Sequence, residues 1–597
     1  MPNLRRATIH STIAVAAALA AAAPVPVLAQ GAAGGAQYDW PSHNLDLGGS
    51  RYAAIDQIDV SNVGRLELAW SVEMERDHSI LQVTPLVVDG VLYYNDAAGA
   101  AFALDAATGE RLWTSDFDPD SISKRVTRPR GPGYGGGRLY PFYGTTVFSV
   151  DPATGEPDPA FGDGGRRDIV AAALHHKYPD SYPPDLDPAA LGHQMMAPPA
   201  YHDGVLYAGV GLSDQHIPGG LVIAFDARTA AIRWVFNTIP QRPSDEGYDI
   251  ARPTWGDGLR AGGGVWTMPA LDPELGLVYV NAGNPSADYD GSGRPGMNLF
   301  TNATIALKME TGEMAWYYQA IHHEVWDIDH VTGPILFDAS RDGRNVRGVA
   351  AGGKNCLMYM GDRTPGAPIN PMVEMAVPTE TDVPGEQIWP TQPFPYNARG
   401  VLLAPFCNTF PIVADSAERP MARQLYTPYS MTDGYIVAHG GSSWGPPSFS
   451  PRTGLLYMTA KDGSIALIVK PVGDSIEIGQ GRGGLTSQVG SKRNQMPPEL
   501  TISAYEPISG EQVWQARAPT VSPIGVSGNL VTAGDILVQG TDTGGFYAFD
   551  ARTGERLFEY MSEQPVRSSP MTYQVDGRQY IVVVASNRIL AFALPAP

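Results

Sequence analysis

Residues 101–113 read AFALDAATGERLW, and variants of this stretch recur along the chain. The other copies are VFSVDPATG at 147–155, VIAFDARTAAIRW at 222–234, IALKMETGEMAW at 305–316, MYMGDRTPG at 358–366, ISAYEPISGEQVW at 502–514 and FYAFDARTGERLF at 546–558. Most copies alternate apolar residues, turn near an Asp-x-x-Thr-Gly sequence and end near an aromatic residue. This pattern predicts a strand, a tight turn and the start of the next strand. Its repetition indicates a repeat architecture.

The spacing of the copies predicts a ring of β-sheet blades. The shortest separations, about 45 residues, suit one four-stranded blade per copy. The longer separations must contain loop insertions or blades whose turn motif has diverged, and LDPELGLVYV at 271–280 and FSPRTGLLYM at 449–458 look like strands of such blades. Seven copies and a diverged one therefore predict an all-β, eight-bladed β-propeller. Strands near 580–593 are expected to close the ring with N-terminal strands, which removes free sheet edges.

The N-terminal residues are typical of a secretory signal. Arg5 and Arg6 precede an apolar run at 13–23, and the residues before the expected cleavage point are small. We expect residues 1–29 to be a signal peptide and residues 30–597 to form a single propeller domain with long loop insertions, exported to a bacterial periplasm. The apolar run is too short for a good membrane span, and no later run of about 20 apolar residues exists.

Charge and cysteine content restrict the partners. The net charge is −21 at pH 7, and such a surface repels nucleic acid and anionic lipid. It would attract a basic redox partner, although an acidic surface is also simply soluble. Cys356 and Cys407 are the only cysteines, and the sequence leaves open whether they pair. No C-x-x-C-H sequence is present, so no covalently attached haem is expected.

Three long segments, 157–195, 237–262 and 365–430, are rich in Pro, Gly, Asp and Tyr and are too polar for a core. On a propeller, such loops gather at one end of the central channel and cover a site there. The alternative is a merely decorative surface.

Residues 322–329 read HHEVWDID and carry the clearest chemical signal. On an extended chain, Asp327 and Asp329 would share one face. Two adjacent carboxylates are costly unless a cation lies between them or one stays protonated. This favours a functional site over a solvated acidic turn.

These features together resemble the pyrroloquinoline quinone (PQQ) dependent alcohol and sugar dehydrogenases. The repeats are similar to the tryptophan-docking motif of that family, and DWPSHNLDLGGSRYAAIDQIDVSNVGRLELAW at 39–70 is similar to its N-terminal segment. The resemblance covers almost all of the chain after the signal. It implies a periplasmic enzyme that oxidises the alcohol group of a sugar, polyol or bulky secondary alcohol to a carbonyl. Electrons would pass to an external acceptor, such as a periplasmic cytochrome c.

The resemblance also assigns roles to particular residues. Trp266, in GVW at 264–266, would be the floor on which the quinone stacks, because a planar, electron-poor ring favours an aromatic platform. Asn284, in NAGNP at 281–285, would give its amide oxygen to a metal, because hard cations favour oxygen donors.

Asp327 occupies the position of the family's catalytic base and would also bind the metal. Asp329 lies where lanthanide-dependent members place an additional metal ligand. Sugar dehydrogenases that use calcium or magnesium can also show W-D-x-D, so the expected metal is Ca²⁺, with a lanthanide as the alternative.

Three further residues would bind the cofactor. Lys354, in GGKN, would reach the quinone oxygens and stabilise negative charge that develops during reduction. Arg130, in Arg-Gly, would bind a cofactor carboxylate through paired hydrogen bonds. Gln82, in LQVTP at 81–85, is the third, and Q-V-T-P is typical of the glucose dehydrogenase branch.

The chain departs from the family pattern in three ways. Many alcohol dehydrogenases of the family carry adjacent cysteines before Arg-Gly, whereas residues 125–129 here read RVTRP, so another group must cover the quinone. The loop that supplies a Glu metal ligand reads GLSDQHIP at 211–218. Asp214, Gln215 or neither would replace that Glu. No membrane or haem domain is recognised. The chain is therefore expected to lie nearer the soluble glucose, sorbose and polyvinyl alcohol dehydrogenases than methanol dehydrogenase.

Two other classes compete with this interpretation. A non-catalytic periplasmic propeller scaffold of the outer-membrane assembly type shares the repeat but lacks Trp266, Asn284, Asp327 and Lys354 as a set. A propeller hydrolase built on the 322–329 segment has no activated-serine motif and the wrong spacing for usual zinc sites. The substrate, natural acceptor and oligomeric state stay open.

Overall fold

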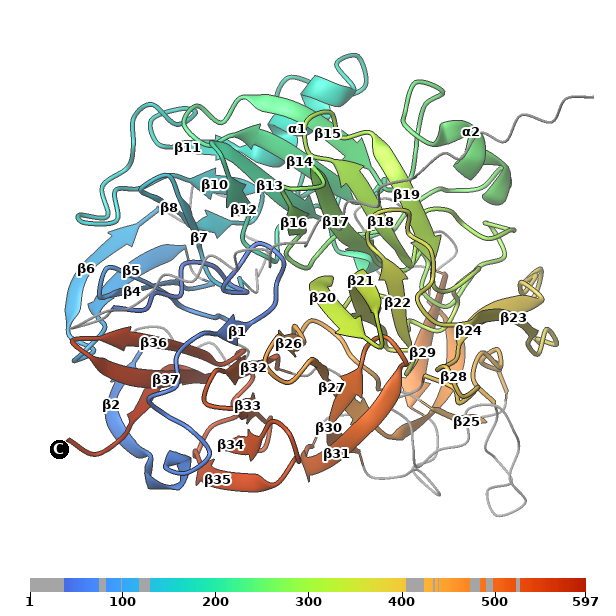
Figure 1. Ribbon diagram of the computed structural model, residues 1–597. Coiled ribbons are helices and arrows are strands. Elements are labelled where there is room, and N and C mark those ends of the chain that lie inside the picture. Colours follow the sequence, from blue (N-terminus) through green and yellow to red (C-terminus); the bar gives the residue numbers. More distant parts are fainter. Residues whose placement is uncertain are drawn as a thin grey trace, which may run out of the picture.

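The computed structural model describes residues 37–74, 82–97, 99–117, 129–403, 424–432, 435–438, 440–472, 484–489, 498–521 and 527–596. In these residues the chain forms eight blades of β-strands around a central axis, and the blades follow one another around the ring (Figure 1). The all-β, eight-bladed β-propeller predicted from the repeats is therefore confirmed. The expected signal peptide and Cys407 lie outside the described residues.

Six blades contain four antiparallel strands each, and the sheet of the seventh blade is extended by the short parallel strand β1 (Tyr52–Ala53). The second blade is divided into two small sheets, and the fifth has three strands. Blade one contains β3 (Leu86–Val88), β4 (Val91–Asn95), β5 (Ala100–Asp105) and β6 (Arg111–Asp116), and blade two contains β7 (Gly133–Gly135), β8 (Arg138–Tyr140), β9 (Phe142–Tyr143), β10 (Thr146–Phe148) and β11 (Arg166–Asp168). Blade three contains β12 (Ala200–His202), β13 (Val205–Val210), β14 (Leu221–Asp226) and β15 (Ile232–Asn237). Blade four contains β16 (Ala270–Asp272), β17 (Leu277–Ala282), β18 (Ala303–Lys308) and β19 (Met314–Gln319).

Blade five contains β20 (Ile335–Arg341), β21 (Arg344–Gly352) and β22 (Met358–Asp362), and blade six contains β26 (Ser448–Ser450), β27 (Leu455–Asp462), β30 (Glu499–Glu506) and β31 (Glu511–Pro519). Blade seven contains β32 (Asn529–Thr532), β33 (Ile536–Gly540), β34 (Gly545–Asp550) and β35 (Arg556–Met561). Blade eight contains β36 (Met571–Val575), β37 (Arg578–Ala585), β38 (Arg588–Ala593) and β2 (Glu67–Glu73). First strands of neighbouring blades contact one another, for example β26 and β32, so they lie nearest the axis.

The remaining elements lie outside the blades or in the insertions. They are β23 (Met372–Ala376), β24 (Thr391–Pro395), β25 (Tyr435–Ala438), β28 (Ser464–Val472), β29 (Gly484–Val489), the helices α1 (Ile169–Lys177) and α2 (Tyr248–Ala251), and the 3-10 turns η1 (Val63–Arg65), η3 (Ser213–Gln215) and η4 (Arg252–Thr254). Among the described helices, none has the length and apolar character needed to cross a bilayer.

The two ends of the chain close the ring, as predicted. In the last blade, β2 pairs antiparallel with β38, and Trp70 lies opposite Ala591. Figure 1 shows the blue N-terminal strand β2 beside the red C-terminal strands of this blade.

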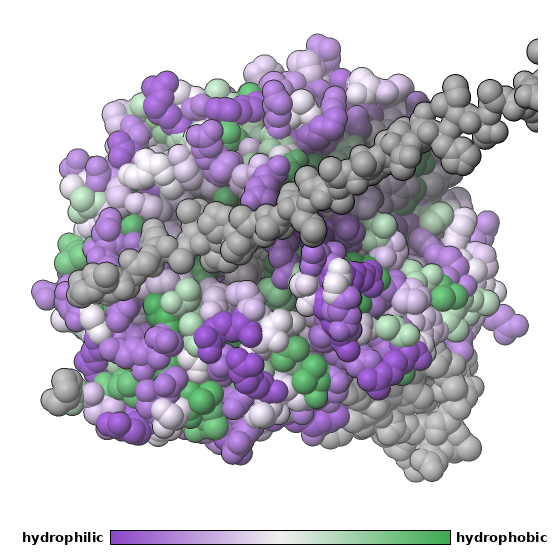
Figure 2. All heavy atoms as spheres, viewed as in Figure 1, coloured by the Kyte–Doolittle hydropathy of each residue, from purple (hydrophilic) through white to green (hydrophobic). Residues whose placement is uncertain are grey.

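The face seen in Figure 2 is largely hydrophilic, with hydrophobic residues scattered over it.

Contacts between blades explain why the sequence repeats. The indole N–H of Trp113 donates to the carbonyl of Pro152, in the turn of the next blade, at 3.0 Å. Trp70, Trp234, Trp316 and Trp514 make the same contact with the turns of the blades that follow them. The turn glycine adopts a positive φ, and a Cβ at Gly155 would lie 2.7 Å from the ring of Trp113. At the turns on which an indole packs, the glycine of the repeat is thus needed because a side chain there would meet the ring.

The exception supports this account. The copy at 222–234 has Ala230 where the others have glycine. The preceding blade ends in β11, whose sequence is Arg-Arg-Asp, so no tryptophan of that strand packs on the turn.

Candidate active site

Strand order brings separate loops to one end of the channel. In an antiparallel blade, the segment before the first strand and the turn after the second strand lie at the same end. Gln82, Arg130 and Trp266 precede the first strands β3, β7 and β16, and Asp327 precedes β20. Asn284 and Lys354 follow the second strands β17 and β21. Motifs that are far apart in the sequence therefore converge.

Gln82, Arg130 and Trp266 form one contiguous group. The Arg130 Nε donates to Gln82 Oε1 at 3.2 Å, and its guanidinium also donates to the backbone oxygen of Trp266. The guanidinium carbon lies 5.2 Å from the centre of the Trp266 ring. All three side chains are buried. An aromatic face beside a buried guanidinium fits a planar ligand that carries carboxylates.

The two predicted aspartates lie on either side of one lysine. The Nζ of Lys354 is 2.9 Å from Asp327 Oδ1 and 2.5 Å from Asp329 Oδ2. The side chains are 13%, 16% and 4% exposed for Lys354, Asp327 and Asp329, respectively. The expectation that these carboxylates need a nearby cation is met by the lysine, and the same oxygens are suitable ligands for a hard metal ion.

Asn284 contacts Asp329 of this group, and its side-chain oxygen remains available to a ligand. Its backbone N–H donates to Asp329 Oδ1 at 3.0 Å, and its side-chain Nδ2 donates to Asp288 Oδ1 at 3.0 Å. The side-chain Oδ1 is buried and has no hydrogen-bond partner among the described residues. Leaving a buried amide oxygen unpaired is costly, so an oxygen beside two carboxylates fits a metal ligand.

Gly283 makes this convergence possible. A Cβ at this position would lie 2.8 Å from Ser213 Oγ, 2.9 Å from Asp329 Oδ1 and 3.3 Å from Trp266 Nε1. The three side chains come from three different blades and can approach one another only because residue 283 has no side chain.

Glu324 shapes the loop that carries Asp327. Its Oε1 accepts hydrogen bonds from the backbone N–H groups of Trp326 and Ile328, at 2.6 and 3.0 Å. Asp327 lies between these two residues with a φ of 57°, a conformation that L-residues rarely adopt. Burial raises the pKa of Glu324 to about 8, and the charges of Asp329 and Asp327 act in the same direction. Glu324 was not predicted to shape the Asp327 loop, although it lies inside HHEVWDID at 322–329.

Two tyrosines also border Asp327. The Tyr289 hydroxyl donates to Asp327 Oδ2 at 3.2 Å, and the Tyr289 ring lies 6.1 Å from that of Tyr429. Burial raises the pKa of Tyr429, and the charge of Asp327 adds to this effect. Neither tyrosine follows from a local motif, because they approach Asp327 from distant segments.

Apolar side chains pack around Trp266. Met196 and Val331 form a buried cluster with it, and Leu212 and Trp444 pack against this cluster. Trp444 was not among the predicted site residues, although GGSSW at 440–444 places a tryptophan after glycines as GGGVW does for Trp266. These side chains are candidates for the group that replaces the missing cysteine pair.

The loop at 211–218 lies beside the site but leaves one prediction open. The Ser213 Oγ accepts from the backbone N–H of Gly264 at 3.0 Å, and the Ser213 carbonyl accepts from Ser286 Oγ at 2.6 Å. The side chain of Asp214 lies outside the description. The choice between Asp214 and Gln215 as a metal ligand therefore stays a prediction. In the described part of the chain, no three His, Cys, Asp or Glu side chains form a metal-binding group by themselves.

Cys356 is disulfide-bonded. The sequence contains one other cysteine, Cys407, whose position lies outside the described residues.

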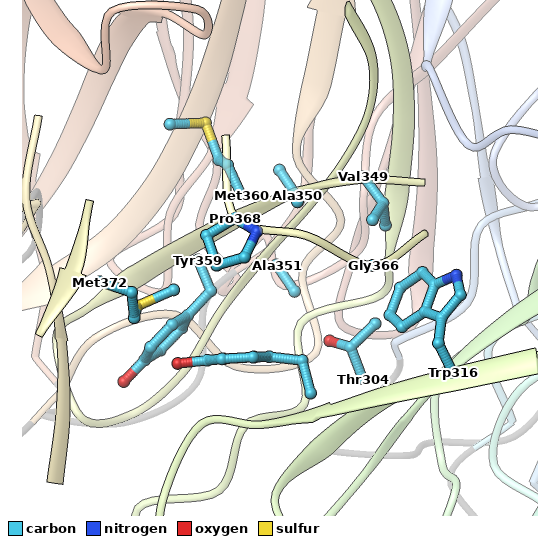
Figure 3. Close-up of a pocket in the computed structure, with 12 residues that line it drawn as sticks. Thr304, Trp316, Val349, Ala350, Ala351, Tyr359, Met360, Gly366, Pro368 and Met372 are labelled. Atoms are coloured by element: carbon cyan, nitrogen blue, oxygen red, sulfur yellow. The ribbon is translucent and has the colours of Figure 1, made fainter. Parts of the chain in front are cut away.

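A small pocket elsewhere does not compete with this site. It lies between blades four and five, where Trp316 packs near Gly366 and Thr304, and Tyr359 and Met372 border it on the other side (Figure 3). Its volume of about 20 Å³ accommodates roughly one water molecule. None of the predicted site residues lines it.

Comparison with known proteins identifies similar chains. The model of the family "PQQ: Glucose/ethanol/alcohol dehydrogenase, beta-propeller domain" matches residues 40–501 and 511–581. The quinohemoprotein alcohol dehydrogenase of Comamonas testosteroni is 29% identical, over 91% of this chain and 72% of that protein. The quinoprotein alcohol dehydrogenase PedH of Pseudomonas putida is 27% identical, over 91% of this chain and 85% of that protein.

Two solved structures share the fold. The crystal structure of the Comamonas testosteroni enzyme superimposes with a TM-score of 0.71 and 24% identity, over 94% of this chain and 81% of the other. A europium-containing methanol dehydrogenase superimposes with a TM-score of 0.69 and 20% identity, over 93% of this chain and 98% of the other.

Proposed function

The chain belongs to the family of PQQ-dependent glucose, ethanol and alcohol dehydrogenases, and from this premise we propose which alcohols it oxidises and which residues take part. The protein is an oxidoreductase that acts on alcohols. We propose a sugar, a polyol or a bulky secondary alcohol as the substrate and a periplasmic cytochrome c as the electron acceptor. We also propose that residues 1–29 export residues 30–597 to the periplasm as one propeller domain.

One observation carries the assignment of the site. Asn284, Asp327, Asp329 and Lys354 meet beside Trp266 at one end of the channel, although they come from three separate loops. A propeller that serves only as a scaffold has no use for one buried and one partly exposed carboxylate, a lysine and an unpaired amide oxygen in one place.

The proposed mechanism gives each side chain one task. When bound, PQQ supplies the two-electron acceptor and Ca²⁺, or a lanthanide, supplies a Lewis acid beside it. Asp327 accepts the proton of the substrate hydroxyl, and the Tyr289 hydroxyl orients its carboxylate. Asn284, Asp327 and Asp329 would hold the metal. Lys354 would hold a positive charge beside these carboxylates and would stabilise the negative charge that develops on the cofactor as it is reduced.

The remaining residues hold the cofactor. Trp266 provides the flat surface that fixes the plane of a stacked ring. Arg130, oriented by Gln82, provides a guanidinium for a carboxylate. These roles follow from the family and agree with the chemistry of the side chains that the structure places there.

The test combines reconstitution with one substitution. Chelator-treated protein should oxidise alcohols with a dye acceptor only when PQQ and Ca²⁺ or a light lanthanide are added together. Recovery with the quinone alone would remove the metal from the mechanism. Asp327→Asn should bind PQQ and lose turnover by several orders of magnitude. Asp342→Asn makes the same change at an exposed residue of positive φ and should leave turnover unchanged. Wild-type turnover in Asp327→Asn would show that another group is the base.

A further inference from the structure

Glu386 connects an insertion to two segments of the site. It lies in the loop that joins β23 to β24, within the insertion after blade five. Its Oε1 is 2.7 Å from His323 Nε2, and its Oε2 accepts from the backbone N–H of Gly291 at 2.5 Å. The Glu386 side chain is 2% exposed and that of His323 is fully buried. This carboxylate therefore joins residues that are far apart in the sequence.

The contact of Glu386 with His323 is a buried hydrogen bond between two ionisable side chains. The Nδ1 of His323 lies 2.8 Å from the carbonyl oxygen of Gly296, and its Nε2 faces the carboxylate. Both ring nitrogens thus lie at hydrogen-bond distance from an oxygen atom, and these two contacts fix the orientation of the imidazole ring. Burial tends to raise the pKa of Glu386, but the hydrogen bond and charge of His323, with the charge of Arg294, lower it overall. A buried pair of this kind is costly to break from one side.

Both segments that Glu386 contacts, those of Gly291 and His323, also carry or contact Asp327. Gly291 is two residues after Tyr289, whose hydroxyl donates to Asp327 Oδ2. His323 is four residues before Asp327 on the same loop. The segment of Gly291 packs tightly against the other two side chains, because a Cβ at Gly291 would lie 2.6 Å from His323 Nε2 and 2.9 Å from Glu386 Oε1. A movement of Glu386 would thus change how the Tyr289 hydroxyl meets Asp327.

We propose that Glu386 is a positioning residue for alcohol oxidation: by binding His323 and the Gly291 N–H together, it sets the geometry between Tyr289 and Asp327. The inference rests on the proposed function of Asp327 as the base. It assigns the insertion at 365–430 a catalytic purpose, because the carboxylate that aligns the site belongs to that insertion.

The same hairpin offers a matched control. Glu374, in β23, lies 3.2 Å from His322 Nε2, next to the His323 pair in the sequence. The Glu374 side chain is 52% exposed, and exposed pairs contribute little. Within the described part of the chain, Glu374 does not contact the segment that carries Tyr289. Glu374→Gln therefore makes the same chemical change in the same hairpin without loosening the Tyr289–Asp327 contact.

The kinetic test uses holoenzyme with saturating PQQ and Ca²⁺. Glu386→Gln should lower kcat by about 10- to 100-fold, the scale expected for a shift of about 1 Å in a reacting group, with the KM for the alcohol unchanged. Glu386→Ala should lower it further, because glutamine retains one acceptor oxygen. Combining Glu386→Gln with Tyr289→Phe should cost no more than the worse single change, since both act through Asp327. A kcat within twofold of wild type in Glu386→Gln would overturn the proposal.

A second measurement does not depend on turnover. Amide hydrogen exchange of cofactor-free protein should be faster at 287–300 and 322–330 in Glu386→Gln than in wild type, and unchanged there in Glu374→Gln. Unchanged exchange at both segments in Glu386→Gln, or an equal increase in both variants, would overturn the proposal. If wild-type protein fails to oxidise alcohols while these exchange differences appear, the proposed function fails and the connection through Glu386 stands.

Discussion

Lys354→Met is the substitution whose effect the structure predicts most directly. The methionine side chain has a similar length but no charge, so the change removes the cation that contacts both Asp327 and Asp329. In metal-free protein, the buried carboxylate of Asp329 and the partly exposed carboxylate of Asp327 would then lack the ammonium group between them.

The size of the effect follows from distance and burial. At 2.9 and 2.5 Å, and an effective dielectric constant of about 20, each attraction is about 6 kcal/mol before desolvation is counted. Burying the ammonium group costs several kcal/mol, which offsets much of this gain. Breaking a buried pair from one side costs about 3–5 kcal/mol. We therefore expect metal-free Lys354→Met to lose about 3 kcal/mol in the free energy of unfolding.

The assay is denaturant unfolding with chelator and again with Ca²⁺. The cation should stabilise Lys354→Met more than wild type, because it replaces the missing positive charge at the carboxylates. Lys308→Met is the control, because Lys308 lies 2.7 Å from Glu313 but both side chains are more than half exposed. That variant should unfold like wild type. Equal unfolding of the two variants, or equal stabilisation of Lys354→Met and wild type by Ca²⁺, would refute the reasoning.

Three further predictions test other features. Asn284→Leu should weaken Ca²⁺ binding in titration calorimetry at least tenfold, by removing the unpaired Oδ1; unchanged affinity would exclude Asn284 as a ligand. Gly155→Ala should lower the free energy of unfolding by more than about 1 kcal/mol, because its Cβ would meet Trp113 at a positive φ; a neutral result would contradict the docking account. Because the pKa of Glu324 is raised from 4.5 to about 8, metal-free wild type should lose stability relative to Glu324→Gln as pH rises from about 4.5 through 8. Urea midpoints measured across this range should diverge, and a constant difference would show that Glu324 is not buried as a neutral acid.

The blades could be predicted because their cause is local. Each copy of the repeat encodes its own turn, and the glycine and the aromatic residue within it are the two partners of the contact between neighbouring blades. The second blade is less regular than its motif indicates, because its outer strand β11 lacks the docking tryptophan. The sequence marks the turn but not the division of this blade into two sheets.

The site could be predicted as far as its residues lie in short motifs. Trp266, Asn284, Asp327 and Lys354 each follow a recognisable signal, and the strand order of a propeller brings such signals to one end. Tyr289, Trp444 and Glu386 could not be assigned, because their contacts depend on how distant loops fold back. The replacement of the family's Glu metal ligand is still a choice between Asp214 and Gln215.

The pairing of β2 with β38 constrains when the protein can become active. A ribosome releases β38 only after the other blades have been synthesised, so β2 must wait, unpaired on this side, until residues 588–593 appear. Such long-range pairing is slow to form. A nascent or truncated polypeptide would have an open seam beside the strand that leads to Gln82. Synthesis of β38, rather than folding of any one earlier blade, therefore becomes the event that assembles the ring.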